Sequence, residues 1–150
     1  MSSLDDIRIT VAEINDEEGG LRDNVRAILQ EIATLLDELL ESGATLESGV
    51  TRAIDIRSLP LLPGDYEALE DVLGTGEVSA EFDGGYGPTE IFETGIPGVW
   101  WIKHFNEEGD IAAEFIEIAR IPEIVLSQED DMRDGLKDLQ ERLNDQYNHH

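Results

Sequence analysis

The sequence of 150 residues contains no cysteine and no long hydrophobic run. The lack of cysteine excludes disulfide frameworks, thiolate zinc sites, cysteine nucleophiles and cysteine ligands for an iron–sulfur cluster. No apolar stretch approaches the roughly 20 residues that a transmembrane helix needs. The first residues lack the basic region and apolar stretch of a signal peptide, so we expect a cytoplasmic protein.

Basic residues are scarce: ten Lys and Arg stand against 35 Asp and Glu, which gives a formal net charge of −25. A surface this acidic repels nucleic acid and anionic membranes and attracts basic partners. We therefore expect no nucleic-acid ligand and no membrane insertion. Solubility in a host with an acidic, salt-adapted proteome would also explain the charge, and mimicry of DNA phosphates is a further alternative.

The spacing of apolar residues in the N-terminal part predicts a strand followed by a long helix. Residues 7–14 alternate apolar and polar side chains, as a half-buried strand does. After Asp16–Gly20, apolar residues recur every three or four positions, which is typical of a helix with a wide buried face. A coiled-coil seam would need the same stripe, but a helix packed on a sheet explains so short a repeat more simply. The stripe consists of Leu21, Val25, Ile28, Ile32, Leu35 and Leu39.

A proline-containing turn follows a loop at 44–51 and a short strand at Ala53–Arg57. Pro60 and Pro63 exclude regular helix or central strand between Ser58 and Asp65. Asp65 is placed to cap a short helix that Gly74 ends. The turn presents its leucines either to the core, which is the commoner use, or to a partner; they are Leu59, Leu61 and Leu62.

From Glu77 onward the hydrophobic period is two, which predicts strands with short connections. Four strands, at about 77–82, Thr89–Thr94, Val99–Phe105 and Ile111–Ala119, form an antiparallel meander. A final amphipathic helix carries Met132, Leu136, Leu139 and Leu143. We expect a single α+β domain over residues 1–150, in which a mainly antiparallel sheet packs with the long N-terminal helix and the C-terminal helix.

Motifs that would indicate an enzyme are missing, since the sequence has no HExxH, GxSxG, Walker or calcium-loop pattern. His104 lies beside Lys103 in an alternating strand, where a solvated or hydrogen-bonded histidine is commoner than a catalytic base. Carboxylate pairs could support acid–base chemistry or a hard metal ion, although 35 acids produce such pairs by chance. The nominal pairs are Glu90 with Glu93 and Glu114 with Glu117. We predict no catalytic residue, no cofactor and no bound metal.

Two adjacent tryptophans are the most informative local feature. Consecutive side chains of a strand point to opposite faces of a sheet, so Trp100 and Trp101 must lie on different faces. If helices cover only one face, the other tryptophan is exposed and would serve as an interface anchor. A sheet covered on both sides, or a tryptophan capped by a loop, is the alternative.

Several motifs between about Arg52 and Leu126 resemble, in order and spacing, the hydrogenase expression protein HupH and its relatives HyaF and HoxQ. They are Ser58-Leu-Pro-Leu61, Leu73-Gly-x-Gly-Glu-Val78, Glu90-Ile-x-Glu-Thr94, Gly98-Val-Trp-Trp101 and Glu114-x-Ile-Glu-Ile118, followed by Pro122.

The resemblance implies a non-catalytic accessory protein for maturation of membrane-bound [NiFe] hydrogenase. Such a protein acts on the precursor of the iron–sulfur small subunit, and with other accessory proteins, before twin-arginine export. An acidic protein with an exposed apolar patch could bind both the paired arginines and the apolar stretch of the precursor's leader. Longer family members carry additional sequence, in some cases a second related copy, whereas this chain has one. A homodimer that rebuilds a two-unit surface therefore stays open.

We expect the partner to bind at the strand from Gly98 to His104 and at the turn from Ser58 to Asp65. The candidate partner-binding residues are Trp100, Trp101, Gly98, Glu90, Glu93, Thr94, His104, Leu59, Pro60 and Leu61. The alternative function is a carboxylate-based metal-binding protein or metal-dependent enzyme that uses Glu90, Glu93, Glu114 and Glu117. His149 and His150 resemble the remains of an affinity tag and receive no role.

Overall fold

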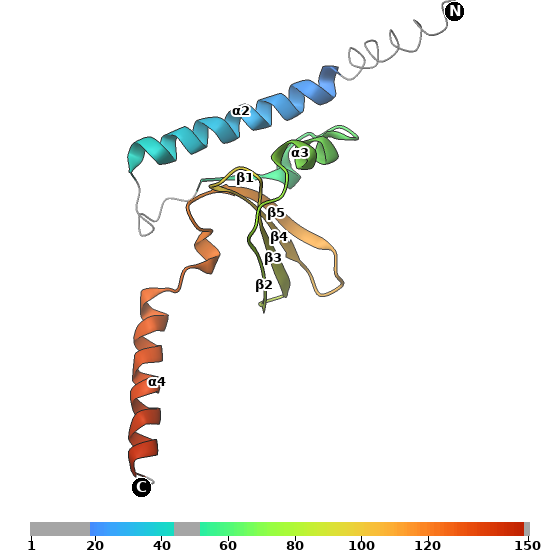
Figure 1. Ribbon diagram of the computed structural model, residues 1–150. Coiled ribbons are helices and arrows are strands. Elements are labelled where there is room, and N and C mark those ends of the chain that lie inside the picture. The colour runs from blue at the N-terminus through green and yellow to red at the C-terminus, as the bar shows by residue number, and fades with distance from the viewer. Residues whose placement is uncertain (1–18, 44–51, 149–150) are drawn as a thin grey trace, which may run out of the picture. The chain divides into compact units, whose positions relative to one another are not determined.

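The computed structural model describes residues 19–43 and 52–148 (Figure 1). The predicted strand at 7–14 and the predicted loop at 44–51 lie outside these residues. The chain divides into two compact units, Met1–Arg120 and Ile121–His150. In the described part, the first unit contains the helices α2 (Gly19–Ser42) and α3 (Asp65–Leu73), the 3-10 turn η1 (Ile56–Ser58) and a sheet.

Within the described residues the sheet has five strands, and every neighbouring pair in it is antiparallel. Its order is β1-β5-β4-β3-β2, so β4 is the central strand and β1 and β2 are the two edges. The strands are β1 (Arg52–Asp55), β2 (Ser79–Gly84), β3 (Gly87–Glu93), β4 (Val99–Phe105) and β5 (Ile111–Ile118). The predicted meander and the α+β class are confirmed.

The link between β2 and β3 shows how local sequence sets the register. Gly84 pairs with Gly87, which leaves Gly85 and Tyr86 as a two-residue turn. Gly85 has a φ of +70°, a left-handed value that the first central residue of such hairpins needs and that glycine adopts without strain.

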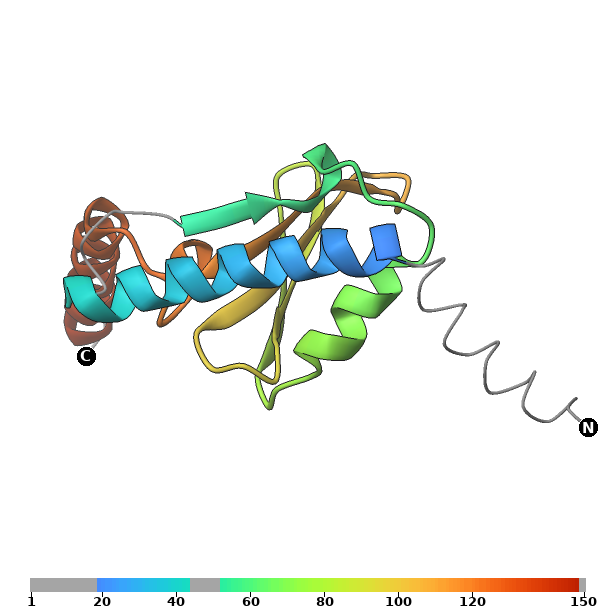
Figure 2. The same ribbon diagram turned by 90° about the horizontal axis from the view of Figure 1, so that it is seen from above.

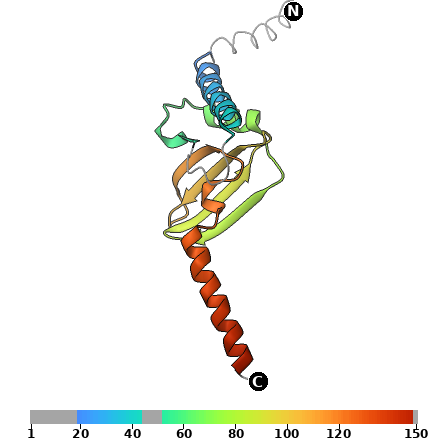
Figure 3. The same ribbon diagram turned by 90° about the vertical axis from the view of Figure 1, so that its left-hand side faces the viewer.

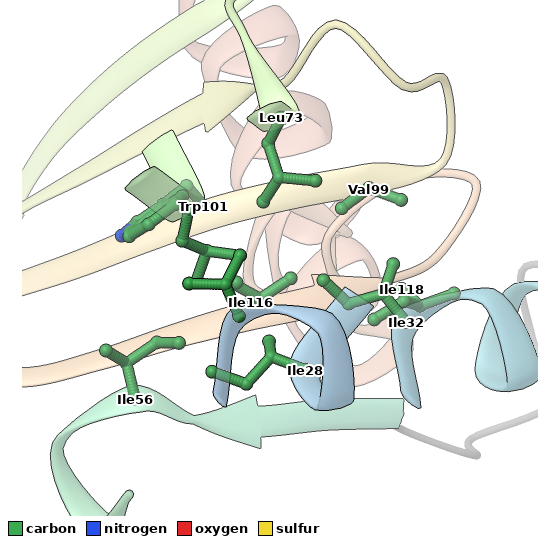
Figure 4. Close-up of a cluster of buried hydrophobic side chains, with 10 residues drawn as sticks. Ile28, Ile32, Ile56, Leu73, Val99, Trp101, Ile116 and Ile118 are labelled. Carbon is green, nitrogen blue, oxygen red and sulfur yellow. The ribbon is translucent and has the colours of Figure 1, made fainter. Parts of the chain in front are cut away.

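The helices α2 and α3 lie on one side of the sheet, as Figure 2 shows from above. Val25, Ile28 and Ile32 of α2 are buried in a cluster with sheet residues such as Ile116 and Ile118 (Figure 4). Leu69 and Leu73 of α3 join the same cluster. Each aliphatic side chain buried in this way contributes about 1.5–3 kcal/mol. The predicted helix with a wide buried face is confirmed.

The second unit contains the turn η2 (Glu123–Val125) and the helix α4 (Glu129–Asn148). Figure 3 shows this helix along its full length. The predicted amphipathic helix is confirmed, and its apolar side chains are exposed by 55–61%. Arg133 pairs with Glu129 and Arg142 with Asp138, both across one helical turn. We call the exposed row the α4 stripe: Met132, Leu136, Leu139 and Leu143.

A search of the described helices finds none that combines the length and the apolar character needed to cross a membrane.

We predict that Ile32→Ala lowers the free energy of unfolding by about 2–5 kcal/mol, because it removes buried methyl groups between α2 and the sheet. Leu40→Ala is the matched control, since Leu40 lies on the same helix and is 73% exposed; its effect should stay within about 0.5 kcal/mol. Urea denaturation measures both. Equal effects would show that α2 does not pack on the sheet.

Candidate functional site

The carboxylate of Glu93, the last residue of β3, binds the backbone of the segment that follows α3. Its Oε1 atom accepts hydrogen bonds from the backbone N–H of Glu77 at 3.0 Å and of Val78 at 3.2 Å. The backbone of Gly76 donates to the carbonyl of Glu93, and that of Gly95 donates to the carbonyl of Leu73. Two of the motifs found in the sequence therefore contact each other directly.

Thr94 and Gly98 shape the connection between β3 and β4. Thr94 is 3% exposed, and its hydroxyl donates to the carbonyl of Val99 at 2.8 Å and accepts from the N–H of Ile96 at 3.1 Å. Gly98 has a φ of +91°, and a side chain there would meet Leu36 of α2. Both residues were expected to bind a partner, and the structure gives them a role in the turn.

The two tryptophans occupy opposite faces of the sheet, as predicted, and both are buried. Trp101 is 5% exposed and belongs to the cluster beneath the helices. Trp100 is 6% exposed and packs with Ile91 and Ile102 on the other face. Its indole N–H donates to the carbonyl of Ala119 at 3.0 Å. The expectation of an exposed tryptophan anchor is therefore wrong, because Trp100 has apolar neighbours and a partner for its N–H.

A carboxyl group is buried on the helix-covered face beside Trp101. Glu114 is 2% exposed, and its Oε2 atom accepts from the hydroxyl of Tyr66 on α3 and, at 2.5 Å, from the indole N–H of Trp101. The Tyr66 and Trp101 rings meet edge to face, with centroids 5.4 Å apart. Burial, followed by the hydrogen bond and the charge of Glu114, raises the pKa of Tyr66 above its ordinary value of 10.0. This group ties α3 to the sheet.

Lys103 lies in register between Glu90 and Glu114 on that face. Its Nζ atom is 5.6 Å from the centroid of the Phe92 ring and 6.0 Å from that of Trp101. A cation held over aromatic rings in this way contributes about 0.5–1 kcal/mol at a partly exposed site. Glu90 is half-buried beside it.

His104 lies on the face of Trp100. Its Nδ1 atom is 2.8 Å from the hydroxyl of Thr89, and its ring meets Phe115 edge to face. This is the hydrogen-bonded strand histidine that the sequence favoured over a catalytic base.

The turn from Ser58 to Asp65 is fixed by Asp65, which is 0% exposed. Its Oδ2 atom accepts from the backbone N–H of Leu62 at 2.7 Å and from the side-chain amide of Asn24 at 2.9 Å. The prediction that Asp65 caps the helix is wrong, because Gly64 is the N-cap and the carboxylate instead closes the turn and binds α2. Leu59 and Leu61 pack against the core, whereas Pro60 is exposed and Leu62 is 48% exposed.

The four carboxylates proposed as a metal site are not brought together. Residues three apart in a strand point to opposite faces, so Glu90 lies with Glu114 on the face of Trp101, and Glu93 lies with Glu117 on the face of Trp100. On each face a residue of β4 separates the two acids. Lys103 lies between Glu90 and Glu114, and Trp100 lies between Glu93 and Glu117. Among the described residues no group of three or more metal-ligating side chains is close enough to hold an ion.

Comparison with known proteins identifies the family. Residues 23–145 match the C-terminal conserved region of the HupH hydrogenase expression protein. The chain belongs to this family. A solved structure of the hydrogenase expression protein HupH from Thiobacillus denitrificans ATCC 25259 is 41% identical, with a TM-score of 0.71, over 81% of this chain and 96% of that one.

Curated relatives carry the same kind of name. The hydrogenase expression/formation protein HoxQ of Azotobacter vinelandii is 29% identical over 71% of this chain and 38% of its own length. HupH of Rhodobacter capsulatus is 29% identical over 73% of this chain and 39% of its own length. The chain thus spans well under half the length of the curated HupH relatives it matches.

Two partly buried hydrogen bonds between side chains were not predicted from the sequence. Asn24 binds Asp65 across 41 positions, and Tyr66 binds Glu114 across 48. Neither pair leaves a spacing pattern in one sequence. The one available signal was the presence of Glu114 among apolar residues in a strand that alternates.

We predict that Gly76→Ala lowers the free energy of unfolding by about 1–3 kcal/mol. The added Cβ would lie 2.5 Å from the carbonyl oxygen of Thr94 and 2.7 Å from Oε1 of Glu93, so the joined segments must separate. Gly84→Ala is the control, because nothing lies within 4 Å of a Cβ there. Chemical denaturation that finds the two variants alike would contradict the link through Glu93.

We predict that stability falls as pH rises above about 10 and that Tyr66→Phe reduces this fall. The raised pKa means that folded Tyr66 keeps its proton where the unfolded chain, with a value near 10.0, loses it. The stabilisation is therefore complete below pH 10 and is lost above it. Urea denaturation at pH 9 and pH 11 measures the slope. Tyr86→Phe, at a residue 84% exposed, is the control; a wild-type slope in Tyr66→Phe would contradict the assignment.

Proposed function

We propose that the chain is a non-catalytic assembly protein of hydrogenase maturation that binds the precursor of the iron–sulfur small subunit. The observation that carries this proposal is the match of residues 23–145 to the conserved HupH region. The relatives it resembles are named hydrogenase expression/formation proteins.

The charge of the chain supports capture of a basic segment. With a net charge of −25, it attracts cationic partners and increases their association rate. A small-subunit precursor with a twin-arginine leader offers two arginines followed by an apolar stretch. The proposed complex forms in the cytoplasm, before export of the precursor.

The turn from Ser58 to Asp65 supports an apolar contact. Leu62 and Pro60 project from it into solvent, while the bond from the Leu62 N–H to Asp65 holds the backbone in place. A surface that is ordered before binding loses less entropy when the partner binds. Trp100 and Trp101 support the complex indirectly, because they hold the sheet that carries the contact surface.

The homodimer that the sequence left open stays a proposal, and the α4 stripe is the surface it would use. Arg133 and Arg142, which flank the stripe, are each paired with a carboxylate of the same helix, Glu129 and Asp138. Contact between two such rows would bury the exposed apolar side chains of both chains.

We predict that isothermal titration detects binding to the purified precursor and weaker or no binding to the subunit without its leader. Affinity should fall at high salt, because counterions screen the charges. Leu62→Ser should weaken binding about tenfold by loss of an exposed apolar contact. Leu40→Ser is the matched control, since it changes an exposed leucine on α2, away from the turn.

Absence of binding to both subunit forms would overturn the proposed partner. Equal binding to both forms at both salt concentrations would contradict capture through the leader.

A further inference from the structure

Among residues 19–43 and 52–148, β2 is the last strand on one side of the sheet, and no described strand pairs with its outer edge. It pairs with β3 alone, as the last strand in the order (Figure 1). Five of its six residues are exposed. An edge of this kind presents backbone donors and acceptors to which another chain can add a strand.

The register identifies which backbone groups are available. The N–H of Glu93 donates to the carbonyl of Val78, and these residues directly precede and follow the first pair of the ladder, in which Ser79 lies opposite Phe92. Hydrogen-bonded and non-hydrogen-bonded pairs alternate along such a ladder. Ala80 and Phe82 therefore bond to β3, whereas the N–H and C=O groups of Ser79, Glu81 and Asp83 point away from it.

The two faces of β2 differ in chemistry. Glu81 and Asp83 are exposed on one face, and Glu90 of β3 lies directly opposite Glu81. On the other face Phe82 is half-buried at the outer end of the cluster formed by Ile91, Trp100 and Ile102. A strand added at this edge would place alternate residues beside carboxylates and beside Phe82.

A second copy of the chain does not suit this edge. Pairing β2 with β2 of another copy would set Glu81 and Asp83 against the same residues on the same face. Like charges placed directly opposite in a sheet are destabilising, and each chain carries a net charge of −25.

We propose that the edge of β2 binds an extended segment of a partner protein in which basic residues alternate with apolar ones. The segment adds as a sixth strand, with its basic side chains beside Glu81 and Asp83 and an apolar side chain over Phe82. Identification of that partner as the hydrogenase precursor rests on the proposed function; the edge site itself does not.

The experiment titrates the full chain with a short synthetic peptide that alternates lysine or arginine with valine. Glu81→Pro removes the outward N–H and keeps the ladder to β3, so affinity should fall about threefold to tenfold. Glu81→Gln keeps this N–H, so binding should persist with weaker salt dependence. The same peptide with N-methyl groups on alternate amides should bind poorly to the unchanged protein. Circular dichroism verifies the fold of each variant.

Binding of the N-methylated peptide with unchanged affinity would overturn strand addition at β2. Equal affinity of the wild type and a folded Glu81→Pro would overturn it as well. The precursor is titrated in parallel: precursor that binds the wild type and Glu81→Pro equally well overturns the edge as the precursor's binding site and leaves the proposed function intact. A peptide that binds as expected beside a precursor that does not bind overturns the proposed function alone.

Discussion

Trp100 and Trp101 are adjacent in the central strand, and the alternation of a strand sends their indoles to opposite faces of the sheet. Each is a large apolar group, so each face needs its own cover. On the face of Trp101 the cover comes from α2 and α3, together with the hydrogen bond to Glu114. On the face of Trp100 it comes from Ile91, Ile102 and Phe82 and from a hydrogen bond to Ala119. Both faces of β4 are therefore occupied by the chain itself.

Because the centre of the sheet is covered in this way, we propose that a partner binds at its periphery. Several residues of the motifs that resemble HupH proteins have structural roles, since Glu93, Thr94 and Gly98 join neighbouring segments. Among the described residues, the accessible groups include the outer edge of β2, Leu62 in the fixed turn and the α4 stripe. The exposed carboxylates of Glu81 and Asp83 favour a basic partner at the edge of β2, and the proposed role in hydrogenase maturation would supply one.

Periodicity was sufficient to predict α2, the antiparallel meander and the amphipathic character of α4, because local spacing determines which face of an element is apolar. It also predicted that the two tryptophans separate. It failed at Trp100, whose burial depends on cross-strand neighbours, and at Asp65, whose carboxylate binds Asn24 of a distant helix rather than its own helix. The carboxylate pairs do not form the alternative metal site for a simpler reason, because a separation of three residues in a strand places Glu90 and Glu93 on opposite faces. Long-range polar contacts such as Tyr66 with Glu114 are not encoded in any short spacing.

The most direct test of a peripheral binding surface is residue-resolved hydrogen–deuterium exchange of the chain, alone and with the hydrogenase precursor. Strand addition at β2 predicts slower exchange in the complex at the outward amides of Ser79, Glu81 and Asp83, with little change at Ala80 and Phe82, which already bond to β3. Slower exchange confined to β4 and β5, with β2 unchanged, would contradict it and return the binding site to the tryptophan strand.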